Sequence, residues 1–521
     1  MVKKIPQDQS RRNAARRRRR VAARHAQAGH WSPQPAPMLT TGKIGYEIGG
    51  NIDATCFGGI AAVHRLVGRL GLPEQVNQDL ALLKVHLPYY ESDHVLNLAY
   101  NVLCGGTRLE DIERLRHDTA YMNALGADLI PDPTTAGDFC RRFTAEDVTA
   151  LMEAINTVRP RLWTSRGREL LGPVAYLDVD GTIAPTGGRR KQGMDISYKG
   201  IWGYAPLIVS LANTKEVLYL VNRPGNAPSH TGAAEWIDKA IDLVAPHAER
   251  VCVRGDTDFS LTGHFDRWAE KVDFVFGMDA NSALRSRAEA LAEDCWTQLQ
   301  RPARMPTDPT TDADEPGSRP SGQTRRREPD HKQRIVVERG YLNLQLNHED
   351  VAEFDYQPGK CGRSYRVIAL RKNITKTRGE QALLEEIRYF FYITTRTDLT
   401  PDQVVACAND RCDQENVIEQ LKNGVNALRL PLYDLLSNWA YMVIAALAWN
   451  IKSWYAMMLH LKQDRRDYIR MEFRRFLNAV ILIPAMVIRH ARAITIRIIG
   501  YQPNLDRLFS AWRTLERTRF G

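Results

Sequence analysis

The spacing of hydrophobic residues predicts a helical region in the first third of the chain. Between residues 41 and 170, apolar side chains recur three or four positions apart, as at Ile60, Val63, Val67 and Leu70. This period places them on one face of an α-helix. We therefore expect residues 41–170 to form an all-α region.

The pattern becomes strand-like after this region. Short apolar runs at 174–180, 206–212 and 250–254 are bounded by turn residues, and a helical stretch lies at about 231–245. Strands that alternate with helices indicate an α/β layer. Residues 171–300 are predicted to form the first part of such a core.

Three further changes of pattern follow. Residues 301–333 are rich in proline and charged side chains, which predicts a disordered linker. Apolar and polar side chains alternate over residues 334–400, and this period predicts a β-rich unit. Residues 401–450 return to a helical pattern, and residues 451–521 are predicted to form a basic helical region.

The positive charge of the chain is concentrated at its two ends. The 521 residues carry a formal net charge of +10. Residues 1–30 contain ten basic side chains and one acidic, and residues 452–521 contain fourteen basic and five acidic, which leaves −8 for residues 31–451. Basic ends suggest a polyanionic partner. The run Arg16–Arg20 fits a disordered arm over residues 1–40 that binds nucleic acid.

Neither a membrane partner nor secretion is expected. No apolar run reaches the roughly 18 residues that a membrane-spanning helix needs. The N-terminus lacks the apolar segment of a secretory signal. The eight cysteines form no Cys-x-x-Cys pair, so reduced thiols in the cytoplasm are the expected state.

Carboxylates stand at the ends of two predicted strands. Asp178 and Asp180 end the first, and Asp256 and Asp258 follow Arg254 at the end of the second. Carboxylates from neighbouring strands repel one another unless a cation lies between them, and Mg²⁺ prefers such hard oxygen ligands. Turn formation is the alternative interpretation, because aspartate is common after strands.

The string around Asp178 is also similar to that of haloacid-dehalogenase-type phosphatases. In that interpretation Asp178 is the nucleophile, Asp180 the general acid and base, and Asp256 a Mg²⁺ ligand. Ser260 stands where those enzymes have a further acidic residue, and the interpretation leaves residues 400–521 without a role.

A helix predicted over residues 409–428 carries a charged stripe. At 100° per residue, Arg411, Glu415 and Lys422 lie within about 40° of one another. The stripe borders the apolar face, whereas surface helices usually place charges on the opposite side. A simple Arg–Glu pair with a solvated lysine is the alternative.

Together these features resemble the DDE transposases of bacterial insertion sequences, specifically transposase DDE domain group 1 with its Tyr-Arg-Glu-Lys signature. The resemblance spans about residues 50–500. It implies an α/β fold with an RNase H-like mixed-sheet core, an N-terminal all-α region, a β-rich insertion and C-terminal helices. The matching positions are Asp180-Gly181-Thr182, Arg223-Pro224-Gly225-Asn226, Arg254-Gly255-Asp256, and the spacing of Arg411, Glu415 and Lys422.

The resemblance also implies roles for individual residues. Asp180, Asp256 and Glu415 would be the catalytic triad and would hold two Mg²⁺ (or Mn²⁺) ions. Arg411 and Lys422 would bind DNA; Ala408 occupies the position of the signature tyrosine. Arg16, Arg17, Arg18, Arg19 and Arg20 would add contacts to DNA phosphates, and Asp178, Asp258 and Arg254 form a second tier of candidates.

The expected function is a Mg²⁺-dependent endonuclease and strand transferase. It would cut DNA at the terminal inverted repeats of a transposon and join the 3′-OH to target DNA, in the bacterial cytoplasm at the nucleoid. Two ends imply a homodimer or a larger assembly in the DNA complex, with residues 41–170 as the recognition and dimerisation region. A domesticated DNA-binding protein without cleavage, and a nuclease without strand transfer, are the alternatives.

Aromatic residues of the predicted insertion are candidates for stacking on a flipped base. They are Tyr341, Tyr356 and Tyr365. Packing within the β-sheet is the alternative role for each.

Overall fold

The computed structural model describes most of the chain. The described residues are 7–28, 37, 39, 42–47, 50, 52–188, 191–301, 342–378, 381–490, 493–500 and 502–520. Apart from its first residue, the predicted linker at 301–333 lies outside them, as does Tyr341. Within these residues, no helix has the length and apolarity needed to cross a membrane.

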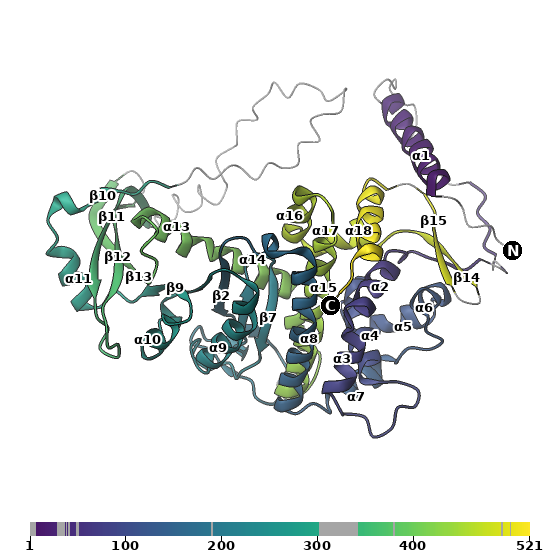
Figure 1. Ribbon diagram of the computed structural model, residues 1–521, viewed down its shortest axis with the longest axis horizontal. Helices are drawn as coiled ribbons and strands as arrows, with labels where there is room; N and C mark the ends of the chain where they lie inside the picture. Colours follow the sequence, from purple (N-terminus) through teal and green to yellow (C-terminus); the bar gives the residue numbers. More distant parts are fainter. Residues whose placement is uncertain are drawn as a thin grey trace.

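A mixed nine-stranded sheet forms the centre of the molecule, which confirms the predicted α/β class (Figure 1). Its core half has the order β7-β6-β2-β8-β9. Strand β2 pairs parallel to β8, and β8 pairs parallel to β9. Strand β6 pairs antiparallel with both of its neighbours, β2 and β7. The bounds are β2 Ala175–Gly181, β6 Leu207–Leu211, β7 Glu216–Val221, β8 Val251–Gly255 and β9 Asp273–Met278.

The β-rich insertion extends this sheet rather than forming a sheet of its own. Strand β13 pairs antiparallel with β9, with Phe391 opposite Met278 and Thr394 opposite Val275. The other half of the sheet therefore has the order β10-β11-β12-β13. The bounds are β10 Thr297–Gln298, β11 Leu342–Tyr356, β12 Tyr365–Arg378 and β13 Gln381–Thr394.

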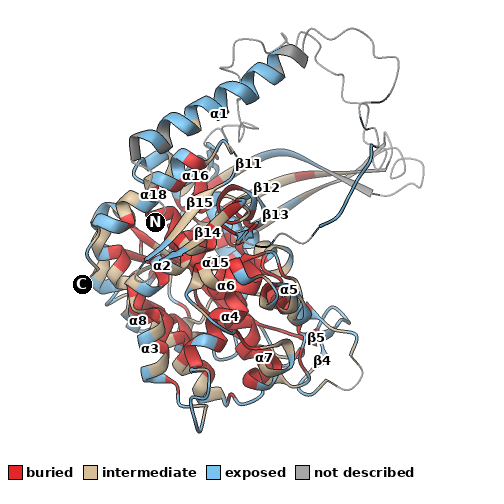
Figure 2. Cartoon of the chain, turned by 90° about the vertical axis from the view of Figure 1, so that its right-hand side faces the viewer, coloured by how far each residue is buried: buried red, intermediate tan, exposed pale blue. Residues whose placement is uncertain are grey.

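Helices pack around one central helix, α15 (Leu435–Met457). Its sequence is apolar on nearly all sides, which is the composition of a helix surrounded by protein. It packs against α4, α8, α16 and β7, and Figure 2 shows α15 and α4 in the buried interior. The remaining helices of this body are α2 Ile60–Leu70, α3 Leu72–Asp79, α4 Glu91–Leu103, α5 Ile112–Arg116, α6 Thr119–Leu125, α7 Pro133–Cys140, α8 Ala145–Arg166, α16 Lys462–Arg470, α17 Phe473–Phe476 and α18 Leu505–Arg517.

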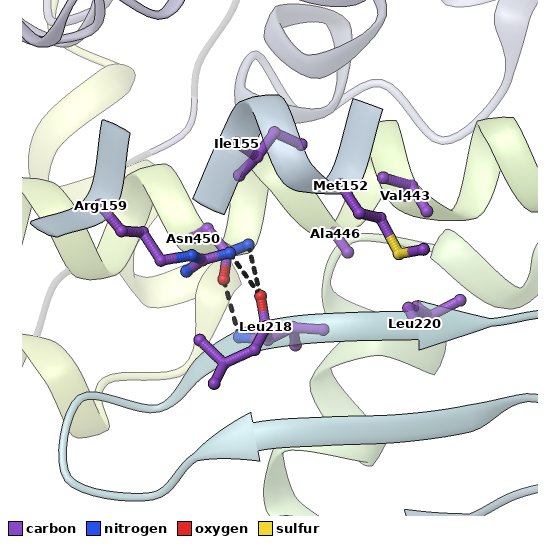
Figure 3. A pocket seen from close by; sticks show the side chains of 9 residues that line it. Met152, Ile155, Arg159, Leu218, Leu220, Val443, Ala446 and Asn450 are labelled. Carbon is purple, nitrogen blue, oxygen red and sulfur yellow. Dashed lines mark hydrogen bonds between the residues drawn. The ribbon is translucent and has the colours of Figure 1, made fainter. Parts of the chain in front are cut away.

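A fully buried ion pair joins three of these elements. Arg159 of α8 donates to Glu216 at the start of β7 over 2.8 Å, and both side chains are inaccessible to solvent. Glu216 Oε1, which accepts from Arg159, also accepts from the indole N–H of Trp454. The other oxygen, Oε2, accepts from the indole N–H of Trp163. Figure 3 shows Arg159 beside Asn450 of α15, which bonds to the backbone of β7.

Two predictions about the ends of the chain were wrong. The predicted C-terminal helical region contains a hairpin, β14 (Ala485–His490) and β15 (Ala493–Ile498), because its isoleucines alternate with polar residues at the strand period. Within the predicted disordered arm lies a helix, α1 (Gln7–Ala28), whose alanines and arginines are strong helix formers. Residues Arg16–Arg20 lie on α1 and are exposed.

Candidate active site

Two carboxylates meet at one edge of the central sheet. Asp180 belongs to the end of β2, and Asp256 directly follows β8. Because these strands are parallel neighbours, their carboxyl ends reach the same edge. Gly255, the last residue of β8, leaves no room for a side chain, since a Cβ there would lie 2.8 Å from that of Phe259.

The guanidinium of Arg411 lies beside this pair. Arg411, at the junction of α13 (Pro401–Asp410) and α14 (Cys412–Glu419), donates to Asp180 Oδ2 over 2.9 Å. Burial raises the pKa of Asp180 to about 6; the Arg411 charge opposes this shift, and the charge of Asp256 adds to it. Burial likewise raises the pKa of Asp256, again against the charge of Arg411. Two carboxylates thus compete for one cation.

The raised pKa predicts that Asp180 limits the stability of the metal-free protein. An unfolded aspartate loses its proton near pH 4, whereas Asp180 in the fold keeps it up to about pH 6, so stability falls as pH rises through this window. We expect Asp180→Asn to increase the free energy of unfolding by about 2–3 kcal/mol at pH 8, with little of this gain at pH 4. Urea unfolding in EDTA at several pH values measures it.

The neighbouring Asp258→Asn is the control for this measurement. Asp258 is exposed, and only its backbone N–H bonds to Asp256, over 3.0 Å. The charge of Asp258 raises the pKa of Asp256 but is not among the causes of the raised pKa of Asp180, so Asp258→Asn should leave the loss of stability near pH 6 in place. A wild-type and an Asp180→Asn protein with parallel profiles would contradict the assigned charge state.

Asp178 serves the structure and cannot act as a nucleophile. Its side chain is 1% exposed, and its two oxygens accept from Nε and Nη2 of Arg254 over 2.7 and 2.9 Å. Arg254 also donates to the backbone carbonyl of Cys407 in α13, over 3.0 Å. The pair thereby ties β2, β8 and α13 together. This geometry is incompatible with the phosphatase interpretation, which needs an accessible Asp178.

A residue that the sequence analysis did not single out holds α14 against the sheet. Gln414 is buried, and its Nε2 donates to the backbone carbonyls of Asp178 in β2 and Ile208 in β6, both over 3.1 Å. A polar residue within the buried helix face that holds Val417 and Ile418 was the available signal. Gln414 fixes the helix that carries Arg411 and Glu415.

The predicted continuous helix over 409–428 is interrupted twice. A break at Arg411 separates α13 from α14, and residues 420–424 form a π-helical turn that contains Lys422. The angular alignment calculated for a regular helix therefore does not extend to Lys422. Lys422 is partly buried, and burial lowers the pKa of its ammonium group.

The structure brings two of the three predicted triad residues together. Arg411 bonds to Asp180 and its charge also acts on Asp256, whereas the side chain of Glu415 is exposed on α14 and has no hydrogen bond or ion pair within the described residues. In the same part of the chain, no group of three or more His, Cys, Asp or Glu side chains lies close enough to hold a metal ion.

The Arg-Pro-Gly-Asn motif supports the backbone beside Asp180. Arg223 is buried and donates to the carbonyls of Ala205, Ser229 and Thr231 over 2.8–2.9 Å. Gly225 lies against a small sheet, because a Cβ there would stand 2.2 Å from the carbonyl oxygen of Asp195. The motif is structural in this molecule.

Comparison with protein-family models identifies a family for this chain. A family model described as Transposase DDE domain group 1 matches residues 43–520. A solved structure of piggyBac transposase, in a synaptic complex with hairpin DNA, is similar at 10% sequence identity and a TM-score of 0.33, with 82% of this chain and 84% of that chain covered. No curated protein matches the chain.

Proposed function

Since the chain belongs to the Transposase DDE domain group 1 family and is a transposase, we propose that it cuts DNA at the ends of its element and joins the freed 3′-hydroxyl to target DNA. The observation that carries this proposal is the pair Asp180 and Asp256 at one sheet edge, with Arg411 bonded to Asp180 and its charge acting on both. Phosphodiester cleavage and strand transfer both need cationic stabilisation of a phosphate at such a site.

The donor set at this edge suits a divalent cation. Asp180 and Asp256 supply hard oxygen ligands, and each destabilises the charge of the other unless a cation is present. Glu415 of α14, four residues after Arg411 in the sequence, would complete the set for two Mg²⁺ or Mn²⁺ ions. When bound, such ions activate the attacking oxygen and stabilise the leaving oxygen of an in-line displacement.

The basic residues have a separate task. Arg411 forms an ion pair with Asp180, and its guanidinium would be free to contact a DNA phosphate if Asp180 held a cation instead. Lys422 provides a second phosphate contact. Arg16–Arg20 on α1 are exposed and add contacts that do not depend on DNA sequence and weaken with salt.

A complete reaction joins two element ends, so the proposal includes at least two copies of the chain in the DNA complex. The helical region at 41–170 is the proposed place for end recognition and for contacts between copies. The bacterial cytoplasm at the nucleoid is the proposed location.

The proposal is tested with labelled DNA from the flanks of the reading frame. The full chain, this duplex and a target plasmid are incubated with Mg²⁺, with Mn²⁺ or with EDTA, and the products are separated on a denaturing gel. With Mg²⁺ and with Mn²⁺ we expect a cut that leaves a 3′-OH, together with joined products. With EDTA we expect neither product. Binding without a cut would favour a domesticated DNA-binding protein, and a cut without joining would favour a nuclease.

A further inference from the structure

A small exposed sheet stands directly beside Asp180. It has the order β3-β5-β4, with β3 Ala184–Pro185, β4 Asp195–Ile196 and β5 Trp202–Tyr204. Strand β3 begins four residues after Asp180, a separation that an extended chain spans in at most about 14 Å. Ala184 pairs with Tyr204, so β5 lies alongside β3. Figure 2 shows β4 and β5 at the surface of the molecule.

The tip of the β4–β5 hairpin (residues 195–204) has a fixed shape. Ser197 is buried, its backbone N–H donates to the Ile201 carbonyl over 2.9 Å, and its hydroxyl accepts from the Ile201 N–H over 3.1 Å. Gly200 closes the turn with a φ of 72°, which favours glycine. From below, Gly225 of the Arg-Pro-Gly-Asn motif allows backbone contact with β4 and β5. Because these contacts already order the tip, a ligand can bind to it without having to order it first.

The hairpin presents aromatic side chains to solvent. Tyr198 is 84% exposed and Trp202 is 53% exposed. Ile196, also exposed, lies opposite Trp202 across the strand pair. An exposed aromatic cluster on a rigid support is typical of a binding surface rather than of a monomer surface.

Positive charge accompanies these rings and connects them to the catalytic edge. The Nζ of Lys199 lies 5.4 Å from the centre of the Tyr198 ring. Lys422 is near enough to Lys199 of the hairpin and to Asp180 of the catalytic edge for the charges of both to act on it. Aromatic rings interleaved with lysines fit a polyanion that carries flat bases.

The insertion tyrosines that were predicted to stack on a base make other contacts. Tyr365 is buried, and its hydroxyl bonds to Asp266 over 2.5 Å. The Tyr356 ring packs beneath the Arg287 guanidinium. These insertion residues stabilise the sheet, and the prediction that they stack on a base is not supported by their contacts.

We propose that the β4–β5 hairpin binds an unpaired base of the DNA strand next to the cut. Trp202 and Tyr198 stack on the base, and Lys199 and Lys422 contact the adjoining phosphates. The inference rests on the proposed function, because it takes DNA as the substrate. Stacking requires no base-specific hydrogen bond, so the site accepts any of the four bases.

The test uses two fluorescent duplexes and no divalent metal. One 30-base-pair probe carries 2-aminopurine in an unpaired four-nucleotide end, and the other carries it in a fully paired end. We expect the wild-type chain to bind the unpaired probe more tightly and to quench its fluorescence. Tyr198→Ala and Trp202→Ala should each weaken binding of that probe by roughly 5- to 100-fold and lose the quenching.

Controls separate stacking from other causes. Trp202→Phe retains a ring and should restore most of the quenching. Phe390→Ala removes an exposed aromatic ring of β13, outside both the hairpin and the proposed recognition region, and should behave as wild type. Thermal unfolding of each variant checks that it is folded.

Each contrary outcome has a distinct meaning. Unchanged quenching in both alanine variants would overturn the hairpin site while leaving the transposase proposal intact. Alanine variants that bind both probes normally but sediment as a smaller species would show that the hairpin contacts a second copy instead. A wild-type chain that binds neither probe would overturn the proposed DNA function itself.

Discussion

Replacing either sheet-edge aspartate is expected to abolish DNA cleavage while leaving DNA binding within a few fold of wild type. For Asp180→Asn and Asp256→Asn we expect the cleavage rate to fall by about a thousandfold or more, since loss of a metal ligand removes several kcal/mol of transition-state stabilisation. The fold should survive, because each carboxylate makes few structural bonds: Asp180 to Gly181 and Arg411, and Asp256 to Asp258. Single-turnover cleavage and filter binding on the same DNA measure the two effects.

Helix α14 offers a matched pair of substitutions that tests the third predicted triad residue. Glu415 and Glu419 are both exposed residues of α14, one turn apart. Glu419 accepts a hydrogen bond from Asn423. We expect Glu415→Gln to lose cleavage as the aspartate variants do, and Glu419→Gln to retain it. The reverse result would move the triad to Glu419, and full activity in all of Asp180→Asn, Asp256→Asn and Glu415→Gln would refute the site.

Glu216→Ala should be among the most destabilising single substitutions in the protein. Glu216 accepts from Arg159, Trp163, Trp454 and Thr214, and its replacement leaves a buried guanidinium without a countercharge. Breaking a buried ion pair in this way costs about 3–5 kcal/mol. Urea unfolding followed by tryptophan fluorescence measures the loss, since Trp163 and Trp454 both bond to this carboxylate.

An exposed glutamate provides the control for Glu216. Glu235 of α9 (Ala233–Val244) is 66% exposed and lies 3.9 Å from Lys239. Glu235→Ala should change the free energy of unfolding by about 0.5 kcal/mol or less. If the two alanine variants unfold at the same urea concentration, the buried network contributes little to stability.

The sheet edge was predictable because its signal is local. A strand that ends in Asp180 and another that ends before Asp256 are visible in the residue pattern, and parallel strands bring their ends together. Alternation alone did not separate Asp178 from Asp180, which lie two residues apart on the same strand. The structure separates them: Asp178 is buried and bonded to Arg254, whereas Asp180 reaches the edge of the sheet and bonds to Arg411.

Other features depended on distant contacts and were not predictable. The break at Arg411 and the π-helical turn around Lys422 interrupt a helix that contacts distant segments. Gln414 bonds to β2 and β6, and Gln420 in the π-helical turn accepts from the Phe473 N–H, contacts that a helical period cannot show. The strand β14 pairs with β1 (Ala54–Thr55), more than 400 residues earlier in the sequence. Such a partner cannot be identified from the residues of Ala485–His490 alone.

The contacts between the two ends of the chain have a consequence for synthesis. Gly59, just before α2, lies so close to Val480 that an added Cβ would stand 1.6 Å from its carbonyl oxygen, and Arg69 bonds to the carbonyls of Leu515 and Thr518. At the usual bacterial and eukaryotic rates of about 5–20 residues per second, α2 leaves the ribosome roughly 20–90 s before these partners exist. The helices of residues 41–170 therefore complete their packing only after these distant partners have been made, and a translation product interrupted before them lacks a finished helical region even though its helices have long been synthesised.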